Sequence, residues 1–334
     1  MPDSKKDRPN AILTSAALSF LWMMPLLSAG CTGQGSTGNL EQIKVWGRRG
    51  LGDGQFQKPR AIAYGPDENL YIVDMTARIQ VFDTDGKFLR SWRTPEYKVG
   101  KPCGLSISND NMLMVADTHY FRILFYSLDG QLDESRTIGG ENGTGPGQFG
   151  FVTDIAQDSK GNYYVSEYGD YDRIQKFSPE GQFLCEWGGH GEKPGEFLRP
   201  QGLTIDKQDR LWVVDSSNHR IQVFDLAPEV PELVTTWGEM GRGPGQFYYP
   251  YDLFFDDQGF LYVCEFGNHR IQKFTTEGEF LGTWGTAGRE VGQVHQPWAA
   301  CLNKEDEVHI LDSYNNRIQT FPKSAIAIPS DSEP

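Results

Sequence analysis

Residues 210–224 read RLWVVDSSNHRIQVF, and five further stretches of the chain repeat this pattern. They are NLYIVDMTARIQVF (69–82), MLMVADTHYFRILF (112–125), NYYVSEYGDYDRIQKF (162–177), FLYVCEFGNHRIQKF (260–274) and EVHILDSYNNRIQTF (307–321). Each has an apolar run that ends in an acid, a short loop, and an arginine that opens a second run. Successive arginines are 44, 51, 47, 50 and 47 residues apart. A period of this length predicts six copies of one supersecondary unit.

Each unit contains four short apolar runs separated by Gly, Asn and Asp, the residues that turns require. The first run often follows a proline, as in PRAIAY (59–64) and PQGLTI (200–205), and the fourth resembles FLRSW (88–92). Four short antiparallel strands make one propeller blade, and a blade buries both faces only by stacking on neighbours. The sequence therefore predicts an all-β, six-bladed β-propeller over residues 40–322.

The two ends of this region predict how the ring closes. Residues 43–47, IKVWG, look like a fourth strand with no first three before it, and unit 6 ends after three strands at Phe321-Pro322. We expect the N-terminal strand to complete the last blade, which removes an exposed sheet edge.

The repeats resemble NHL repeats, whose hallmark is an Asn-His-Arg-Ile-Gln-like stretch. Residues 218–222 and 268–272 match it, and the loops GTGPGQF (143–149) and GRGPGQF (241–247) resemble the linker of that family. The resemblance covers residues 40–322 and implies the same six-bladed fold; unit 2 departs from it most. Amidating lyases with NHL-like repeats hold zinc with histidines around the channel, and the matching positions here carry no His.

The N-terminus resembles that of an exported bacterial lipoprotein. A basic start with Lys5, Lys6 and Arg8 precedes an apolar run over residues 11–29, and Cys31 follows small residues as in a lipobox. The resemblance implies a signal peptide over residues 1–30, a lipidated Cys31, a flexible tether over 31–39 and a location in the bacterial cell envelope. The membrane would be contacted through the lipid anchor only. A plain signal peptide and a single membrane-spanning anchor are the alternatives, and residues 323–334 read as a C-terminal tail.

The charge of the chain argues against nucleic acid as a partner. The 334 residues carry a formal net charge of −14, and lysines and arginines are spread along the sequence. An acidic surface repels phosphate backbones unless its basic residues gather in one patch.

Four cysteines remain after Cys31, namely Cys103, Cys185, Cys264 and Cys301. They permit two disulfides in an exported protein, but we expect free thiols because a domain of this size can bury enough apolar surface to be stable without disulfide cross-links.

The acid and arginine of each unit are predicted to be structural. An active site is normally unique, whereas this pair occurs six times. Pairing the two side chains across one short loop satisfies the polar groups at the end of a blade.

Positions that break the repeat are the candidates for function. Units 3 and 5 each have an Asp at the start of the innermost strand and a Glu at the end of the next, and Tyr251 and Trp298 occupy neighbouring strand starts. The predicted ligand-binding residues at the channel mouth are Asp154, Glu167, Tyr251, Asp252, Glu265 and Trp298. The alternative is that each Asp caps a strand or pairs with a neighbouring Arg.

Two classes of function follow from these residues. The first is a binding or scaffold module for a protein, peptide or glycan, because aromatic planes with acids suit such ligands. The second is a metal-dependent lyase or lactone hydrolase that uses the acids as ligands or acid/base groups. No cofactor is predicted, although paired carboxylates suit a divalent cation such as calcium or zinc.

Overall fold

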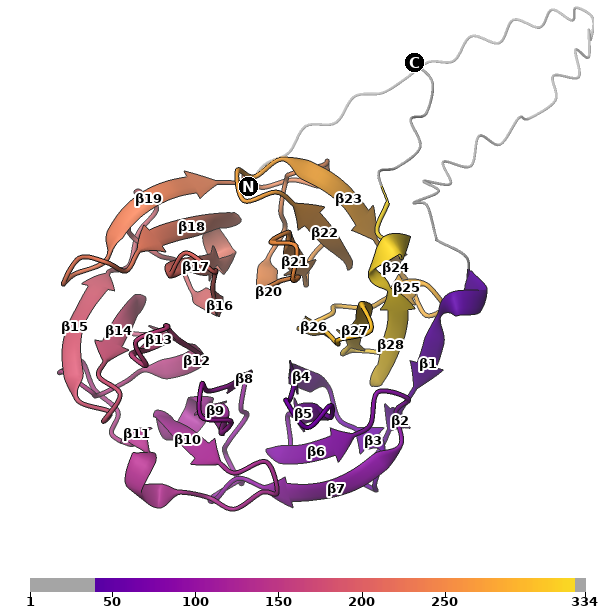
Figure 1. The fold of residues 1–334 in the computed structure, drawn as a ribbon, viewed down its shortest axis with the longest axis horizontal. Helices are drawn as coiled ribbons and strands as arrows, with labels where there is room; N and C mark the ends of the chain where they lie inside the picture. The colour runs from indigo at the N-terminus through magenta and orange to yellow at the C-terminus, as the bar shows by residue number, and fades with distance from the viewer. Residues whose placement is uncertain (1–39, 328–334) are drawn as a thin grey trace, which may run out of the picture. The chain divides into compact units, whose positions relative to one another are not determined.

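Each repeat unit folds as a four-stranded antiparallel sheet, and six such sheets stand around a central channel (Figure 1). The coordinates are a computed structural model that describes residues 40–327. The predicted signal peptide, Cys31 and the tether lie outside these residues, as does most of the C-terminal tail. No helix within the described part is long and apolar enough to cross a membrane.

The first strand of each blade lines the channel and the fourth lies at the rim (Figure 1). Blades 1 to 3 contain β4 (Pro59–Tyr64), β5 (Leu70–Asp74), β6 (Arg78–Phe82), β7 (Phe88–Arg93), β8 (Gly104–Ile107), β9 (Leu113–Asp117), β10 (Arg122–Tyr126), β11 (Ile138–Gly139), β12 (Phe151–Gln157), β13 (Tyr163–Tyr168), β14 (Arg173–Phe177) and β15 (Phe183–Gly188). Blades 4 to 6 contain β16 (Pro200–Ile205), β17 (Arg210–Asp215), β18 (Arg220–Asp225), β19 (Glu232–Trp237), β20 (Pro250–Phe255), β21 (Leu261–Glu265), β22 (Arg270–Phe274), β23 (Phe280–Trp284), β26 (Ala300–Leu302), β27 (Glu307–Asp312), β28 (Arg317–Pro322) and β1 (Lys44–Trp46).

Shorter elements lie in the linkers between blades, in loops within blades and at the two ends of the described chain. Two-residue strands form two parallel pairs, and single 3-10 turns occur in several loops. They are β2 (Arg48–Arg49) with β3 (Gln55–Phe56), β24 (Thr286–Ala287) with β25 (Gln293–Val294), and η1 (Leu40–Gln42), η2 (Thr118–Tyr120), η3 (Glu134–Arg136), η4 (Ser216–Asn218) and η5 (Lys323–Ala325).

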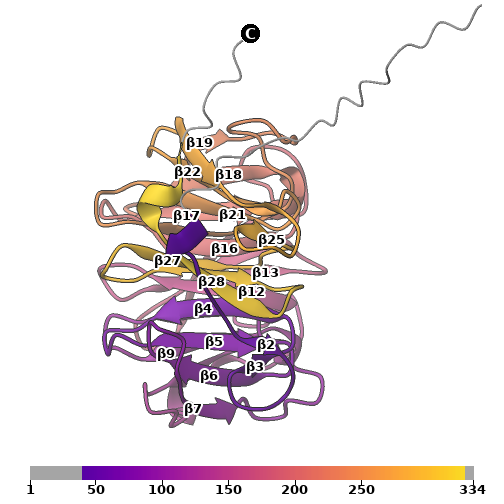
Figure 2. The ribbon, with the colours of Figure 1, turned by 90° about the vertical axis from the view of Figure 1, so that its right-hand side faces the viewer.

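The predicted closure of the ring is confirmed. Strand β1 pairs antiparallel with β28, with Lys44 opposite Thr320 and Trp46 opposite Ile318. The Trp46 Nε1 also donates a hydrogen bond to Thr320 Oγ1 at 3.2 Å. Figure 2 shows β1 running beside β28 at the junction of the first and last blades.

The C-terminal end of the described chain leaves blade 6 and crosses to blade 5. Lys323 forms ion pairs with Asp306 at 2.8 Å and Asp256 at 3.6 Å, and Ala327 pairs with Thr283 of β23. Ordered packing therefore continues past residue 322, where the sequence places the end of the propeller.

Aromatic rings fill the space between neighbouring blades. Between blades 3 and 4, Trp187 and Phe197 each contact Phe224, with ring centroids 5.7 Å and 5.8 Å away. Phe197 comes from the linker and has no exposed surface. A Cβ atom on Gly188, whose φ is +108°, would lie 2.6 Å from the Phe197 ring. Both the close approach and the positive φ require glycine there.

The repeated acid–arginine pairs join each blade to its linker, as predicted. In blade 4 the Nε of Arg220 donates to Asp215 at 2.7 Å, and the other oxygen of Asp215 accepts from the backbone N–H of Leu198 at 2.8 Å. The Nη atoms of Arg220 donate to backbone carbonyls of the linker. We call these six pairs the framework pairs: Asp74–Arg78, Asp117–Arg122, Glu167–Arg173, Asp215–Arg220, Glu265–Arg270 and Asp312–Arg317.

The four cysteines of the described chain are all free, as expected. Cys264 and Cys301 are buried in the blades, and Cys103 and Cys185 are half-buried.

Candidate functional site

The starts of the innermost strands and the ends of the second strands lie on one face, which we call the mouth face. The register shows this directly, because Pro59 stands opposite Asp74 and Pro250 stands opposite Glu265. The expectation that both sets of residues share one face is therefore confirmed. The residues that line the channel at this face differ among the six blades, whereas the framework pairs beside them do not.

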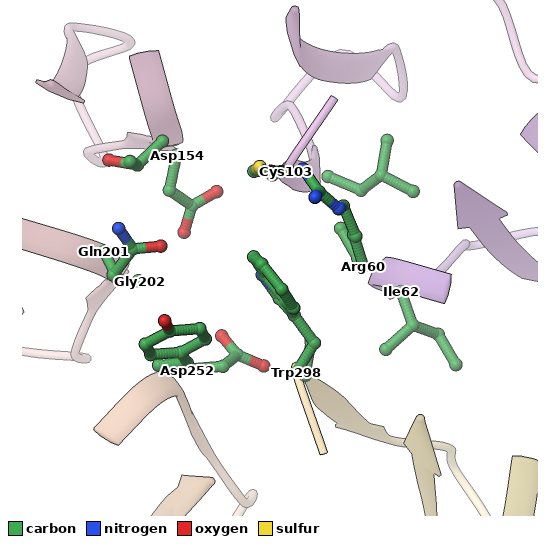
Figure 3. A pocket seen from close by; sticks show the side chains of 14 residues that line it. Arg60, Ile62, Cys103, Asp154, Gln201, Gly202, Asp252 and Trp298 are labelled. Atoms are coloured by element: carbon green, nitrogen blue, oxygen red, sulfur yellow. Dashed lines mark hydrogen bonds between the residues drawn. The ribbon is translucent and has the colours of Figure 1, made fainter. Parts of the chain in front are cut away.

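Side chains from all six blades surround a small lumen in the channel near the mouth face (Figure 3). Its lumen has a volume of about 30 Å³ and is lined by the start of every inner strand, with Arg60, Cys103, Asp154, Gln201, Asp252 and Trp298 among the lining residues. This volume accommodates about two water molecules. A peptide or a sugar therefore cannot pass through the lumen, and a larger guest must bind on one side of it.

Asp154 and Asp252 both point into the lumen (Figure 3). One carboxylate oxygen of each also accepts a hydrogen bond from the backbone of the next blade. Asp154 Oδ2 accepts from the backbone N–H of Leu203 at 2.9 Å, and Asp252 Oδ2 accepts from that of Ala300 at 3.0 Å. Each Asp sits at a β-bulge, where the register with the second strand shifts. A bulge turns a side chain out of the regular alternation, which explains how both carboxylates reach the lumen.

Burial raises the pKa values of both lumen carboxyls. Asp252 is half-buried and its exposed surface faces the narrow lumen, so the loss of hydration raises its pKa to about 7. Burial also raises the pKa of Asp154 well above its ordinary value, and the nearby charge of Asp252 raises it further. At neutral pH the lumen therefore carries less negative charge than two ordinary aspartates would.

The two predicted glutamates do not join the lumen aspartates. Glu167 and Glu265 are buried and bind Arg173 and Arg270 at 2.7 Å and 2.5 Å. Their remaining oxygens accept from linker N–H groups, as Asp215 does in blade 4. The predicted cluster of four acids does not form, because Glu in units 3 and 5 is the framework acid lengthened by one methylene.

Tyr251 and Trp298 belong to an aromatic cluster on the mouth face, as the sequence suggests. Tyr251 stacks on Phe266 with centroids 4.5 Å apart, and Trp298 meets Tyr251 edge-on at 4.9 Å. Tyr314 adds a further edge contact to Phe266 at 5.9 Å. In Figure 3 the indole of Trp298 extends toward the centre of the lumen.

Sequence reasoning missed three cations on this face, which we call the mouth cations: Arg60, Lys101 and Arg199. They line a cavity of about 170 Å³ above the lumen, the mouth cavity, which Cys103, Thr118, His119, Tyr168, Gln201 and Trp298 also line. None of the three makes an ion pair with an acid of residues 40–327. The guanidinium of Arg60 lies over Trp298 at 4.6 Å, and that of Arg199 lies over Tyr168 at 4.8 Å.

Several hydrogen-bond donors in the mouth cavity have no acceptor. The Nε atoms of Arg60 and Arg199 and the Nε2 of Gln201 are buried and lack a partner among the described residues. Gln201 is only 4 % exposed. Arg60 uses Nη1 for the carbonyl of Lys101 and the sulfur of Cys103, both at 3.3 Å.

The electrostatic effect of the mouth cations appears in a neighbouring histidine. Burial lowers the pKa of His119, and the charges of Lys101 and Arg60 lower it further. The signal for these cations is present in the sequence, since Lys101 and Arg199 directly precede the proline of their units and Arg60 directly follows one.

The described residues contain no group of three or more His, Cys, Asp or Glu side chains placed to hold a metal ion. The possible calcium or zinc therefore stays a prediction from the sequence.

A family model described as NHL repeat matches residues 197–224 and 247–274. NHL repeat-containing protein 3 of Mus musculus is 31% identical over 163 residues, which is 46% of this chain and 46% of that protein. The peptidylglycine alpha-amidating monooxygenase of Rattus norvegicus is 33% identical over 133 residues, which is 37% of this chain and 13% of that protein. The matched part of the chain thus spans less than half the length of these relatives.

Solved structures with the same fold include enzymes. A virginiamycin B lyase from Staphylococcus aureus superposes with a TM-score of 0.56 at 14% identity, covering 86% of this chain and 96% of the lyase. A gluconolactonase from Xanthomonas campestris gives 0.59 at 12% identity, covering 81% and 87%. Identities this low show the fold alone. The repeat matches, the relatives and the ring of six sheets agree that the chain contains NHL repeats and folds as a six-bladed β-propeller.

Proposed function

We propose that this propeller is a binding module that captures a protein or peptide on its mouth face. The observation that carries the proposal is the set of mouth cations, which pair with no acid of residues 40–327 although the full chain has a net charge of −14. NHL propellers are commonly protein-interaction modules, which supports the same class of function.

The mouth cations should lower the stability of the protein when no ligand is bound. Like charges that gather in a partly buried site repel one another, and donors without acceptors lose hydration without compensation. An anionic group of a ligand that binds there would supply the negative charge and the hydrogen-bond acceptors that the described residues do not provide. The neighbouring cluster of Tyr251, Phe266 and Trp298 offers the apolar area in which interface residues with large binding contributions are typically found.

We also propose that the module is held at the bacterial cell envelope by lipid on Cys31. The support is the basic start, the apolar run and the small residues before Cys31. Cys31→Ala should release the protein from the membrane or leave an uncleaved precursor. Normal processing with unchanged membrane association would contradict the anchor.

The enzymatic alternative is less well supported. A metal-dependent lyase or lactone hydrolase would draw on Asp154 and Asp252 alone, because Glu167 and Glu265 are committed to framework pairs. Each Asp already uses one oxygen on a backbone N–H, which leaves few ligands for a cation. Elemental analysis tests this alternative, and one stoichiometric calcium or zinc per chain would favour it.

Binding by the mouth face is tested with the full chain in detergent and three arrays: random octapeptides, glycans and single-stranded RNA. We expect peptide binding that Trp298→Ala weakens at least tenfold, because the indole forms the rim of the lumen. Val234→Ala removes an exposed apolar side chain from rim strand β19 and serves as the matched control. Binding of glycan or RNA only, no binding to any array, or peptide binding indifferent to Trp298 would each contradict the proposal.

A further inference from the structure

We infer that the mouth cavity is a carboxylate-binding site that receives the C-terminal end of an extended peptide. The inference deepens the proposed function, because it names the chemical group through which the guest is held. It rests on the donors, the size of the cavity and the charges around it.

The unpartnered donors come from opposite sides of the ring. Arg60 lies on β4 of blade 1, whereas Gln201 lies on β16 of blade 4 and Arg199 directly precedes that strand. Most buried N–H groups in folded proteins have an acceptor, and three of those that lack one among residues 40–327 gather around this single cavity. A group with two oxygen acceptors that enters from the solvent side would satisfy donors from both blades.

Charge favours a carboxylate over phosphate. Guanidinium donors can bind either anion with two parallel hydrogen bonds, so donor geometry alone does not choose between them. The lumen below holds Asp154 and Asp252, so a second negative charge on the guest would face growing repulsion as Asp252 ionises. A monoanion gains from the mouth cations with less of this penalty.

The size of the cavity favours a chain end. A volume of about 170 Å³ admits one small terminal group, and the lumen beneath it blocks a chain from passing through. The residues before the carboxylate would then lie across the face. Trp298 stands between the guanidinium of Arg60 at 4.6 Å and the ring of Tyr251 at 4.9 Å, so the carboxylate site and the aromatic cluster are continuous.

The test compares two fluorescein-labelled octapeptide pools that are identical except for a free or an amidated C-terminus. Fluorescence anisotropy with the full chain in detergent should show at least tenfold tighter binding of the free-acid pool. An amidated pool with an internal Glu separates a terminal carboxylate from a side-chain carboxylate. Inorganic phosphate, added as a competitor, tests the choice of anion.

Two variants test the residues. Arg199→Gln and Arg60→Gln should each weaken binding of the free-acid pool about tenfold. Each should change the affinity for the amidated pool by less than twofold. Arg242→Gln removes an exposed positive charge from a linker of the same face outside the mouth cavity, and should change neither pool by more than twofold.

Equal binding of the acid and amide pools overturns the carboxylate site but leaves a Trp298-dependent peptide module standing. Wild-type affinity in both arginine variants also overturns the site. So do tighter binding of the internal-Glu pool than of the free-acid pool, and displacement of peptide by phosphate at lower concentration than by acetate. If no pool binds, the proposed function fails as well.

Discussion

The framework arginines and the mouth arginines lie on the same face of the propeller, but their hydrogen-bond and charge partners differ. Arg173 has 4 % of its side chain exposed and binds Glu167, Glu186 and three linker carbonyls. Arg199, in contrast, lies over two aromatic rings and pairs with no acid of residues 40–327. The fold therefore pairs the arginine that recurs in every blade with an acid, whereas the arginine that occurs in a single blade has no acid partner among residues 40–327. Substitution of the two kinds should separate stability from binding.

The largest effect is expected for Arg173→Ala. Removing this guanidinium leaves Glu167 buried without its partner, and loss of one member of a buried pair costs about 3–5 kcal/mol. Urea denaturation followed by tryptophan fluorescence measures the change in the free energy of unfolding. A loss below about 1 kcal/mol would show that the framework pair does not stabilise the blade.

Arg220→Ala should have the same sign and a smaller size. This side chain is 12 % exposed, so water can replace part of what it gives to Asp215. We expect a loss of about 1–3 kcal/mol in the same denaturation experiment. The folded fraction should bind peptide as the parent does, and lost binding at unchanged stability would assign Arg220 to the site instead.

Arg199→Gln should reverse the pattern. The substitution removes a charge that pairs with no acid in the described part of the chain, so the free energy of unfolding should rise or change by less than about 0.5 kcal/mol. Peptide affinity should fall as described above. A clear destabilisation would place Arg199 with the framework arginines and remove the contrast between the two sets.

The smallest effect is expected from pH. The lumen gains negative charge beneath the mouth cations as Asp252 ionises around its pKa of about 7, so free-acid peptides should bind roughly two- to fivefold more weakly at pH 8 than at pH 6. Burial raises the pKa of Asp154 well above its ordinary value, and burial together with the charges of Lys101 and Arg60 lowers the pKa of His119. Asp252→Asn should abolish the dependence, and a parent-like pH profile in that variant would contradict it.

The pH dependence of folding stability should also reflect the ionisation of Asp252. The native protein retains a proton on Asp252 that the unfolded chain releases near its ordinary pKa of 3.8. Stability contributed by this carboxyl therefore falls as pH rises from about 4 to 7 and is level above that. Melting temperatures of the parent and Asp252→Asn should diverge across this interval, with the variant more stable at pH 8.

The repeated part of the fold could be predicted because a strand that is unclear in one unit can be recognised by comparison with the other five. The framework pairs and the strand pattern recur in every unit, and the lone strand at residues 43–47 has one vacant position to fill. Tyr251, Asp252, Trp298 and Asp154 were also placed correctly beside the channel, since their position depends only on the start of the inner strand.

The remainder of the site depends on side-chain direction, which the repeat does not reveal. Glu167 looks like a departure from the pattern, yet its carboxylate reaches the same arginine and linker N–H as the aspartates do. The mouth cations look unremarkable in a list of scattered lysines and arginines. Only the ring brings Arg60 and Arg199, which lie in blades 1 and 4, to one cavity.

The closure of the ring also sets an order in time. Trp46 and Thr320, which are hydrogen-bonded across the last blade, are 274 residues apart in the chain. A ribosome adds about 5–20 residues per second, so β1 waits many seconds for its partner strand to be made. Until then the ring lacks the strand pairing that joins blade 1 to blade 6, and the mouth cavity takes residues from both of these blades. A chain truncated before β28 keeps every residue that lines the mouth cavity, yet we expect it to lose the cavity because its ring stays open.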